Sequence, residues 1–165
     1  NVDVFKLDTS TLSSLLRAMA YNGEWKPFFD YLNAEVKKQA SIRDHLNGEK
    51  VLQGFMIAYL NVTYHFFTWS ERESGGGFVD LYLEPFVMRF PDMNYGYLIE
   101  LKYMSEKQYN GENGKTNFDN RIEEAEQQLH RYASDERLQQ YADKVTFKKV
   151  VLGYVGWQLK VAKEV

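Results

Sequence analysis

The chain has 165 residues, 44% of them hydrophobic and 16% aromatic, which is enough for one well-packed domain and too few for two. It contains no cysteine, which excludes disulfide bonds and thiolate metal sites, and its three histidines lack the spacing of a zinc site. The formal net charge of −3 excludes the overall basic charge of a dedicated nucleic-acid-binding protein.

The first sixty residues predict three helices. Apolar residues recur there with the period of a helix, and Asn-Gly pairs at 22–23 and 47–48 interrupt the pattern. The predicted helices cover residues 10–21, 26–45 and 49–60.

Strand-forming residues dominate the middle of the chain. Residues 64–69 are aromatic, residues 78–86 alternate with period two, and residues 97–104 are a short apolar run interrupted by charges. The polar segment 105–120, rich in Gly and Asn, predicts a mobile loop beside a sheet.

Helical periodicity returns over residues 122–133, and residues 149–161 predict one long strand or a pair of strands broken near Gly156. The order is thus helices, three strands, a helix, and one or two strands. This order predicts an α/β fold, in which helices flank a mixed central β-sheet.

We expect one globular domain, in which residues 1–46 form a helical extension packed on a core of residues 47–165. Because the chain begins at Asn1, in a segment that reads as helix-forming, we also expect it to be a fragment of a longer protein. No apolar run approaches the roughly 20 residues that span a bilayer, and the N-terminus lacks a signal-peptide pattern. The sequence therefore predicts a cytoplasmic protein with no membrane partner.

Two charged residues lie in the predicted strand 97–104. Residues two apart in a strand share a face, so Glu100 and Lys102 point the same way. Removing a charged side chain from water in an apolar strand, without a partner, costs roughly several kcal/mol of free energy. Something should therefore compensate Glu100 and Lys102.

A third charged residue, Asp80, lies in the preceding predicted strand, and pairing of the two strands would bring it opposite Glu100. Two carboxylates on neighbouring strands offer the oxygen ligands that Mg²⁺ prefers, and a nearby lysine adds a fixed positive charge. The alternative is an ordinary pair of Glu100 and Lys102 on an edge strand, with Asp80 capping a turn.

These residues belong to two segments that carry a family resemblance: Glu71-Arg-Glu-Ser-Gly-Gly-Gly-Phe-Val-Asp80-Leu-Tyr-Leu-Glu-Pro and Ile99-Glu100-Leu101-Lys102. They resemble the PD-(D/E)XK nuclease superfamily. They are most similar to the PD-(D/E)XK-like domain that follows an AAA-ATPase-like domain in bacterial proteins. The resemblance covers residues from about 47 to the C-terminus, and Val79 departs from it where the motif has proline.

The resemblance implies a restriction-endonuclease-like core that hydrolyses phosphodiester bonds of nucleic acid, with DNA favoured over RNA. It implies Mg²⁺, with Mn²⁺ as a substitute, held by Asp80, Glu100 and the main-chain carbonyl of Leu101. Lys102 would be the catalytic lysine. It also implies an ATPase-like domain in the same full-length chain.

The helix predicted over 122–133 carries a polar residue in its apolar stripe. Gln128 follows the same spacing as Ala125, Leu129 and Tyr132, so it faces the sheet. The family has a similar glutamine and tyrosine beside its site, which implies catalytic and substrate contacts for Gln128 and substrate contacts for Tyr132. The alternative is a buried amide bonded to the backbone.

Glu49 is the last candidate, because it shares a helical face with Leu52, Phe55, Met56 and Tyr59. The resemblance maps it to a catalytic glutamate of the first core helix. The alternative is a glutamate placed in a first helical turn by the helix dipole, with Asn47 as N-cap.

Two other functions stay open. In the first, the domain is a catalytically inactive nuclease-like module that serves binding or regulation beside an ATPase domain. In the second, an aromatic surface mediates protein contacts, including a homodimer; its candidates are Tyr21, Trp25, Phe28, Phe29 and Tyr31. Basic residues that could line a nucleic-acid groove are Lys107, Lys115, Arg121, Arg131, Lys148 and Lys149, unless they form a solvated face.

Overall fold

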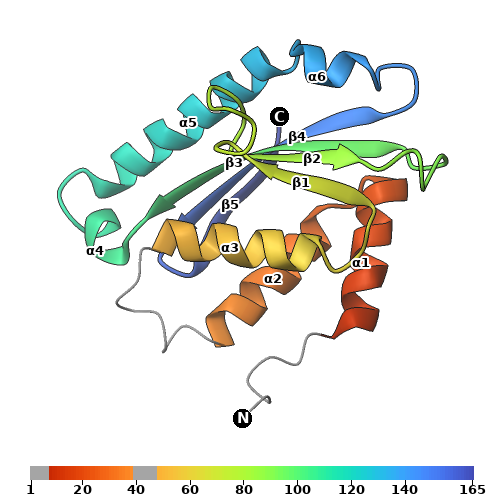
Figure 1. Ribbon diagram of the computed structural model, residues 1–165. Coiled ribbons are helices and arrows are strands. Elements are labelled where there is room, and N and C mark those ends of the chain that lie inside the picture. The colour runs from red at the N-terminus through yellow and green to blue at the C-terminus, as the bar shows by residue number, and fades with distance from the viewer. Residues whose placement is uncertain (1–7, 39–47) are drawn as a thin grey trace.

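The computed structural model describes residues 8–38 and 48–165. In this part of the chain, a five-stranded sheet in the order β1-β2-β3-β4-β5 has helices on both faces (Figure 1). The helices are α1 (Thr9–Asn22), α2 (Lys26–Lys38), α3 (Gly48–Leu60), α4 (Glu106–Tyr109), α5 (Gly114–Tyr132) and α6 (Glu136–Gln139). The strands are β1 (Phe66–Ser70), β2 (Leu81–Pro85), β3 (Tyr95–Met104), β4 (Thr146–Val155) and β5 (Gln158–Glu164). The predicted α/β fold with a mixed sheet is confirmed.

Helices α1, α2 and α3 cover one face of the sheet. Helix α1 begins after Asp8, whose side chain accepts the N–H of Thr11 at 3.0 Å, and ends at Gly23, which has a φ of 71°. The buried face of α1 contacts the sheet, where the hydroxyl of Tyr97 donates to the carbonyl oxygen of Met19 at 2.7 Å. Helices α1, α2 and α3 therefore share one apolar core with β3.

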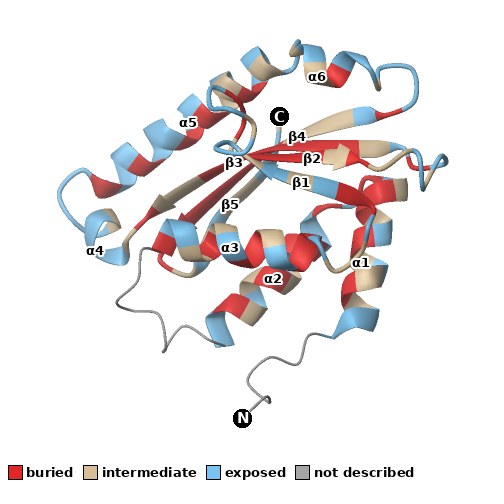
Figure 2. Cartoon of the chain, in the orientation of Figure 1, coloured by how far each residue is buried: buried red, intermediate tan, exposed pale blue. Residues whose placement is uncertain are grey.

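The aromatic residues at the start of α2 belong to this core, so the prediction of an aromatic interaction surface is wrong. Trp25, Phe28 and Phe29 are buried, and the rings of Phe28 and Phe29 lie 5.0 Å apart. Tyr21 and Tyr31 are half-buried. The spacing of Trp25, Phe28 and Phe29 is that of a core-facing helical stripe. Figure 2 shows buried segments on the sides of α1, α2 and α3 that face the sheet.

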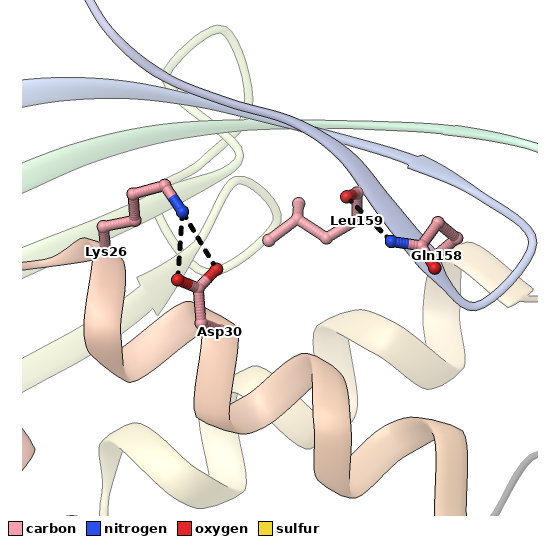
Figure 3. Close-up of polar contacts among 4 residues, drawn as sticks. All are labelled: Lys26, Asp30, Gln158 and Leu159. Atoms are coloured by element: carbon pink, nitrogen blue, oxygen red, sulfur yellow. Dashed lines mark hydrogen bonds and ion pairs between the residues drawn. The ribbon is translucent and has the colours of Figure 1, made fainter.

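Polar contacts fasten α2 to the edge strand β5. The N–H of Leu159 donates to Asn33 Oδ1 at 3.0 Å, and Lys37 Nζ donates to Gln158 Oε1. Figure 3 shows Gln158, which also donates to the carbonyl oxygen of Leu159, and the Lys26–Asp30 ion pair nearer the start of α2. These contacts tie the N-terminal helices to the last strand of the sheet.

Helix α5 covers the opposite face (Figure 1). Its buried residues Phe118, Ile122, Ala125 and Leu129 repeat at helical spacing and pack on β3 and β4. Gly153 of β4 allows this close approach, because a Cβ there would collide with Phe118 and Ile122.

The prediction of a loop over residues 105–120 is wrong, because α4 and the first turns of α5 occupy most of it. Ser105 and Gln108 form a capping box that starts α4. Helix α5 begins at Gly114, where a Cβ would collide with the carbonyl oxygens of Gln108 and Tyr109. Helix α5 is therefore longer than the predicted segment 122–133.

The sheet is mixed. Strands β3 and β4 are parallel, and the other neighbouring pairs are antiparallel. The connection from β3 to β4 runs through α4, α5 and α6 on one face. Of the two predictions for residues 149–161, the pair of strands is confirmed, with a turn at Gly156, which has a φ of 56°. Strand β2 begins at Leu81, so it is shorter than the predicted 78–86.

The predicted division into 1–46 and 47–165 stays a prediction. The end of the predicted helix 26–45 and the N-cap Asn47 lie outside the described residues. Within the described ranges, no helix is long and apolar enough to cross a membrane.

Candidate active site

The centre of the site is a pair of carboxylates on adjoining strands. Residue Leu81 of β2 pairs with Ile99 of β3, and this register puts Asp80 opposite Glu100, as the sequence predicted. The N–H of Asp80 donates to Glu100 Oε1 at 3.3 Å, and the N–H of Leu101 donates to Asp80 Oδ2 at 2.8 Å. Asp80 lies just before β2, where the strand pairing ends and its side chain can reach β3.

Glu100 is buried, with 3% of its surface exposed. Burial, and then the negative charge of Asp80, raise the pKa of Glu100 to about 8, while Lys102 opposes the shift. At neutral pH, Asp80 and Glu100 therefore lie close together with too little nearby positive charge to favour ionisation of both carboxyl groups. Such a pair gains from an added cation.

Lys102 lies on the same face of β3 as Glu100. Its Nζ is 3.9 Å from Glu100 Oε2, and 23% of its side chain is exposed. Strand β3 is flanked by β2 and β4, and Glu100 is buried, so the alternative of an ordinary surface pair on an edge strand does not hold. Lys102 therefore reaches from the acid pair toward solvent.

A cleft of about 550 Å³ opens beside the acid pair, between α3 and the turn after β1. Asp80 and Leu101 form part of its wall, and Glu49 lies on the α3 side. The lining residues that sequence reasoning did not single out are Lys50, Gln53, Gly54, Ile57, Ser70 and Arg72. A signal existed for the α3 residues, because positions 50, 53, 54 and 57 share one face of a helix.

Glu49 is exposed, whereas Leu52, Phe55, Met56 and Tyr59 of its predicted stripe are buried. It lines the cleft with Asp80. Among the described residues, however, no three Asp, Glu, His or Cys side chains are grouped so that they could hold a metal ion. Glu49 thus lies in the same cleft as the acid pair without completing a three-carboxylate cluster.

Gln128 and Tyr132 both lie on α5, on the face of the sheet that this helix covers. Gln128 Oε1 is buried, and no hydrogen-bond partner for it is found among the described residues, which contradicts a backbone bond to this oxygen. The ring of Tyr132 packs on Phe78 at 5.4 Å. Burial, and then the negative charges of Glu100 and Glu71, raise the pKa of the Tyr132 hydroxyl.

The candidate basic residues do not form one groove. Lys148 lies at the start of β4, where its Nζ is 3.2 Å from Glu164 Oε1. Lys107 is on α4, next to the other end of β4, where Gly156 meets Glu106. Arg121 donates to the carbonyl oxygen of Tyr103 at 3.0 Å. Lys148 and Lys107 therefore lie near opposite ends of a ten-residue strand and cannot line the same local groove, while a smaller groove formed by the other candidates stays a prediction.

The donor set of the site fits a hard divalent cation. Asp80 and Glu100 supply carboxylate oxygens, and Leu101, which lines the cleft with Asp80, adds a main-chain carbonyl next to Glu100. Mg²⁺ commonly binds one or two carboxylates and keeps several waters, so two carboxylates and a carbonyl suit it. No zinc-like set of nitrogen and sulfur ligands stands in the described cleft.

The mixed α/β sheet carries Glu100 and Lys102 on β3 with Asp80 opposite Glu100, an arrangement typical of nuclease-type domains. The chain belongs to the PD-(D/E)XK nuclease superfamily, whose model matches residues 47–164. Members of this superfamily generally use divalent metals, and the family implies a nucleic-acid substrate. Comparison with curated proteins and with solved structures gives no match.

Proposed function

We propose that this domain hydrolyses phosphodiester bonds of DNA in a reaction that depends on Mg²⁺, with Mn²⁺ as a substitute. The observation that carries the proposal is the contact of Asp80 with Glu100 and Leu101, with Lys102 3.9 Å from Glu100. Glu100, Leu101 and Lys102 follow one another along β3, Asp80 lies opposite Glu100, and Asp80 and Leu101 line one cleft.

Asp80, Glu100 and the carbonyl oxygen of Leu101 would hold the metal ion. The ion would supply Lewis-acid activation of the phosphate and lower the pKa of an attacking water. Deprotonation of Glu100, whose pKa is raised, would accompany loading of the site.

Lys102 would orient the attacking water or neutralise the negative charge that develops on the phosphate. Its partly exposed side chain, anchored on a buried strand, suits this role because its Nζ lies close to the acid pair, 3.9 Å from Glu100 Oε2. An ammonium placed before the reaction stabilises developing charge without having to reorganise.

Gln128 and Tyr132 would border the phosphate on the α5 side. The Gln128 amide oxygen is buried without a hydrogen-bond partner among the described residues, and the negative charge of Glu100 contributes to the raised pKa of Tyr132. Glu49, on the opposite wall, would act through water rather than as a direct metal ligand, because it is exposed and outside the acid pair.

The test is calorimetric titration of Mg²⁺ and Mn²⁺ into the wild type and Asp80→Asn, followed by plasmid nicking on the same samples. Asn keeps an oxygen that can accept the N–H of Leu101 but removes a charge. We expect metal binding to be lost and nicking to fall by at least about a hundredfold. Asp119→Asn, an exposed change on α5, is the matched control and should nick like the wild type.

Metal binding and nicking that survive in Asp80→Asn would remove the acid pair from the mechanism. A wild type that binds metal in the Asp80-dependent manner but does not cut would instead support the second candidate, a nuclease-like module that binds or regulates. The formal net charge of −3 favours that second candidate. An ATPase-like domain in the full-length chain and a homodimer stay predictions.

A further inference from the structure

A second pocket, of about 400 Å³, lies on the other face of β1 and β2. Trp69, Tyr82 and Glu84 point from the strands toward α6, and Arg137 and Gln140 close the pocket from that helix and its end. Glu73 and Ser74, from the turn after β1, form its rim. None of the residues assigned above to metal or phosphate lies among this lining.

The floor of the pocket holds a polar group without a partner. Tyr82 is 3% exposed, and no hydrogen bond to its hydroxyl is found in the described part of the chain. The hydroxyl lies near Glu84 and Arg137, whose charges act on it. A buried donor left unsatisfied is unfavourable, so a ligand that accepts from it, or donates to it, gains a ready partner.

The charge of the pocket does not suit a phosphate. Glu73 and Glu84 contribute two carboxylates. Glu84 already accepts from Trp69 Nε1 and from the Tyr141 hydroxyl. Glu73 Oε1 accepts from Ser70 Oγ, so the second oxygen of Glu73 is the one to which no hydrogen bond is found in the described part of the chain. The guanidinium of Arg137 is already 3.2 Å from Asp135 Oδ1 and lies over the ring of Phe78 at 4.0 Å. An uncharged ligand that offers N–H donors to carboxylate oxygens fits this set better than an anion does.

Trp69 provides a flat apolar wall. It is 38% exposed, and its Nε1 donates to Glu84 Oε1 at 3.1 Å, which fixes the plane of the indole. Nucleobases stack on exposed aromatic rings of this kind, and their edges carry N–H donors and carbonyl acceptors. Gln140 and Ser74 can pair with both kinds of group.

The pocket and the catalytic cleft meet along one turn. Ser70, Glu71 and Arg72 line the cleft, and the next two residues, Glu73 and Ser74, line the pocket. The turn 70–74 thus borders both the cleft and the pocket, and we expect a strand whose phosphate lies at Asp80 to pass over this turn to Trp69.

We propose that this second pocket receives an unpaired nucleobase of the substrate strand, next to the bond that is cut. The inference rests on the proposed nuclease function and narrows its substrate to nucleic acid that is single-stranded or frayed at the cutting point. A base that is stacked and paired inside a duplex could not present both its face to Trp69 and its edge to Glu73, Tyr82 and Gln140.

The test measures binding in EDTA, so that it does not depend on cleavage. The probes are a fluorescently labelled single-stranded 12-mer DNA and the blunt duplex of the same sequence. We expect the single strand to bind more tightly than the duplex, and Trp69→Ala to weaken its binding by about tenfold. Trp69→Phe keeps a stacking ring and should restore most of the affinity.

Tyr82→Phe separates ligand binding from folding. It removes only the unpaired hydroxyl, so the melting temperature should stay or rise, while single-strand affinity should fall. Trp157→Ala, in the turn between β4 and β5, is the matched control and should bind like the wild type.

Equal binding by wild type, Trp69→Ala and Trp157→Ala would overturn the pocket, whether or not the protein nicks plasmid. Competition by a free nucleoside as effective as that by the oligonucleotide would overturn the assignment to the substrate strand. Trp69-dependent binding by a protein that never cuts would support the pocket and reject the proposed catalysis. In a protein that does cut, Trp69→Ala should raise KM for single strands and leave kcat unchanged.

Discussion

The main-chain N–H of Asp80 donates to the side chain of Glu100 at 3.3 Å, so the backbone of one acidic residue hydrogen-bonds the carboxylate of the other. Asp80 in turn takes its own hydrogen bond from Leu101, the neighbour of Glu100. The two acids are therefore held by each other's strands. A change at one alters the charge and the position of the other.

The first prediction concerns the pH dependence of stability without metal. The pKa of Glu100 is about 8 in the folded state, against an ordinary value of 4.5 in an unfolded chain, so between these pH values the folded protein keeps a proton that the unfolded chain has lost. The free energy of unfolding should therefore fall as pH rises between these values, by up to about 1.4 kcal/mol per pH unit. Glu100→Gln binds no proton and should remove this slope.

Melting temperatures of both proteins in EDTA from pH 5 to 9 check this prediction. Other titrating groups, such as His65, are common to both proteins and cancel in the difference between them. A difference that does not change with pH would mean that Glu100 is ionised throughout the folded state.

The second prediction concerns Gln128. Its side-chain oxygen is buried without a partner, so Gln128→Met, which has similar volume and no polar atom, should keep or raise the melting temperature. If the amide contacts substrate, as proposed, cleavage should fall by roughly tenfold or more, since a lost charge-assisted contact costs about 1.5–3 kcal/mol. A large loss of stability with normal cleavage would show that the amide serves packing instead.

The third prediction compares two glycines. On α3, a Cβ at Gly54 would meet no atom within 4 Å, so Gly54→Ala should stabilise the protein by about 0.5–1 kcal/mol through helix propensity. At the start of α5, Gly114→Ala should destabilise it, because the methyl group would collide with two carbonyl oxygens. Chemical denaturation of the two variants measures both effects.

The fourth prediction concerns the N-terminal helices. The family match begins at residue 47, yet α1 and α2 share their core with β3 and β5. A chain of residues 47–165 would expose the apolar face of the sheet, and we expect it to aggregate or to lack a cooperative thermal transition. A truncated chain that melts cooperatively near the full-length temperature would make residues 1–46 a dispensable extension.

The fold class and the acid pair could be predicted from the sequence because their signals are local. Period-two alternation locates β2 and β3, and the isolated charges at Asp80 and Glu100 stand out against apolar neighbours. The register that joins them follows from a short connection between antiparallel strands. Their metal-binding and catalytic roles stay predictions.

The predictions that are wrong rest on residue composition, whereas the spacing of the same residues indicates the observed structure. Glycine and asparagine suggested a loop over 105–120, although Ser105 and Gln108 carry the spacing of a capping box. The aromatic residues Trp25, Phe28 and Phe29 suggested a binding surface, although their spacing is that of a core stripe. The second pocket could not be foreseen, since Arg137 and Trp69 meet only through the packing of α6 on the sheet.

The hydrogen bond between the Tyr97 hydroxyl and the Met19 carbonyl joins groups 78 residues apart in sequence. During synthesis at about 5–20 residues per second, α1 would wait roughly 4–16 s before β3 exists to cover it. The apolar sides of α1 and α2 therefore emerge from the ribosome well before their partner strand. Nascent chains of this protein should depend on a holdase for those seconds, far more than the finished domain does.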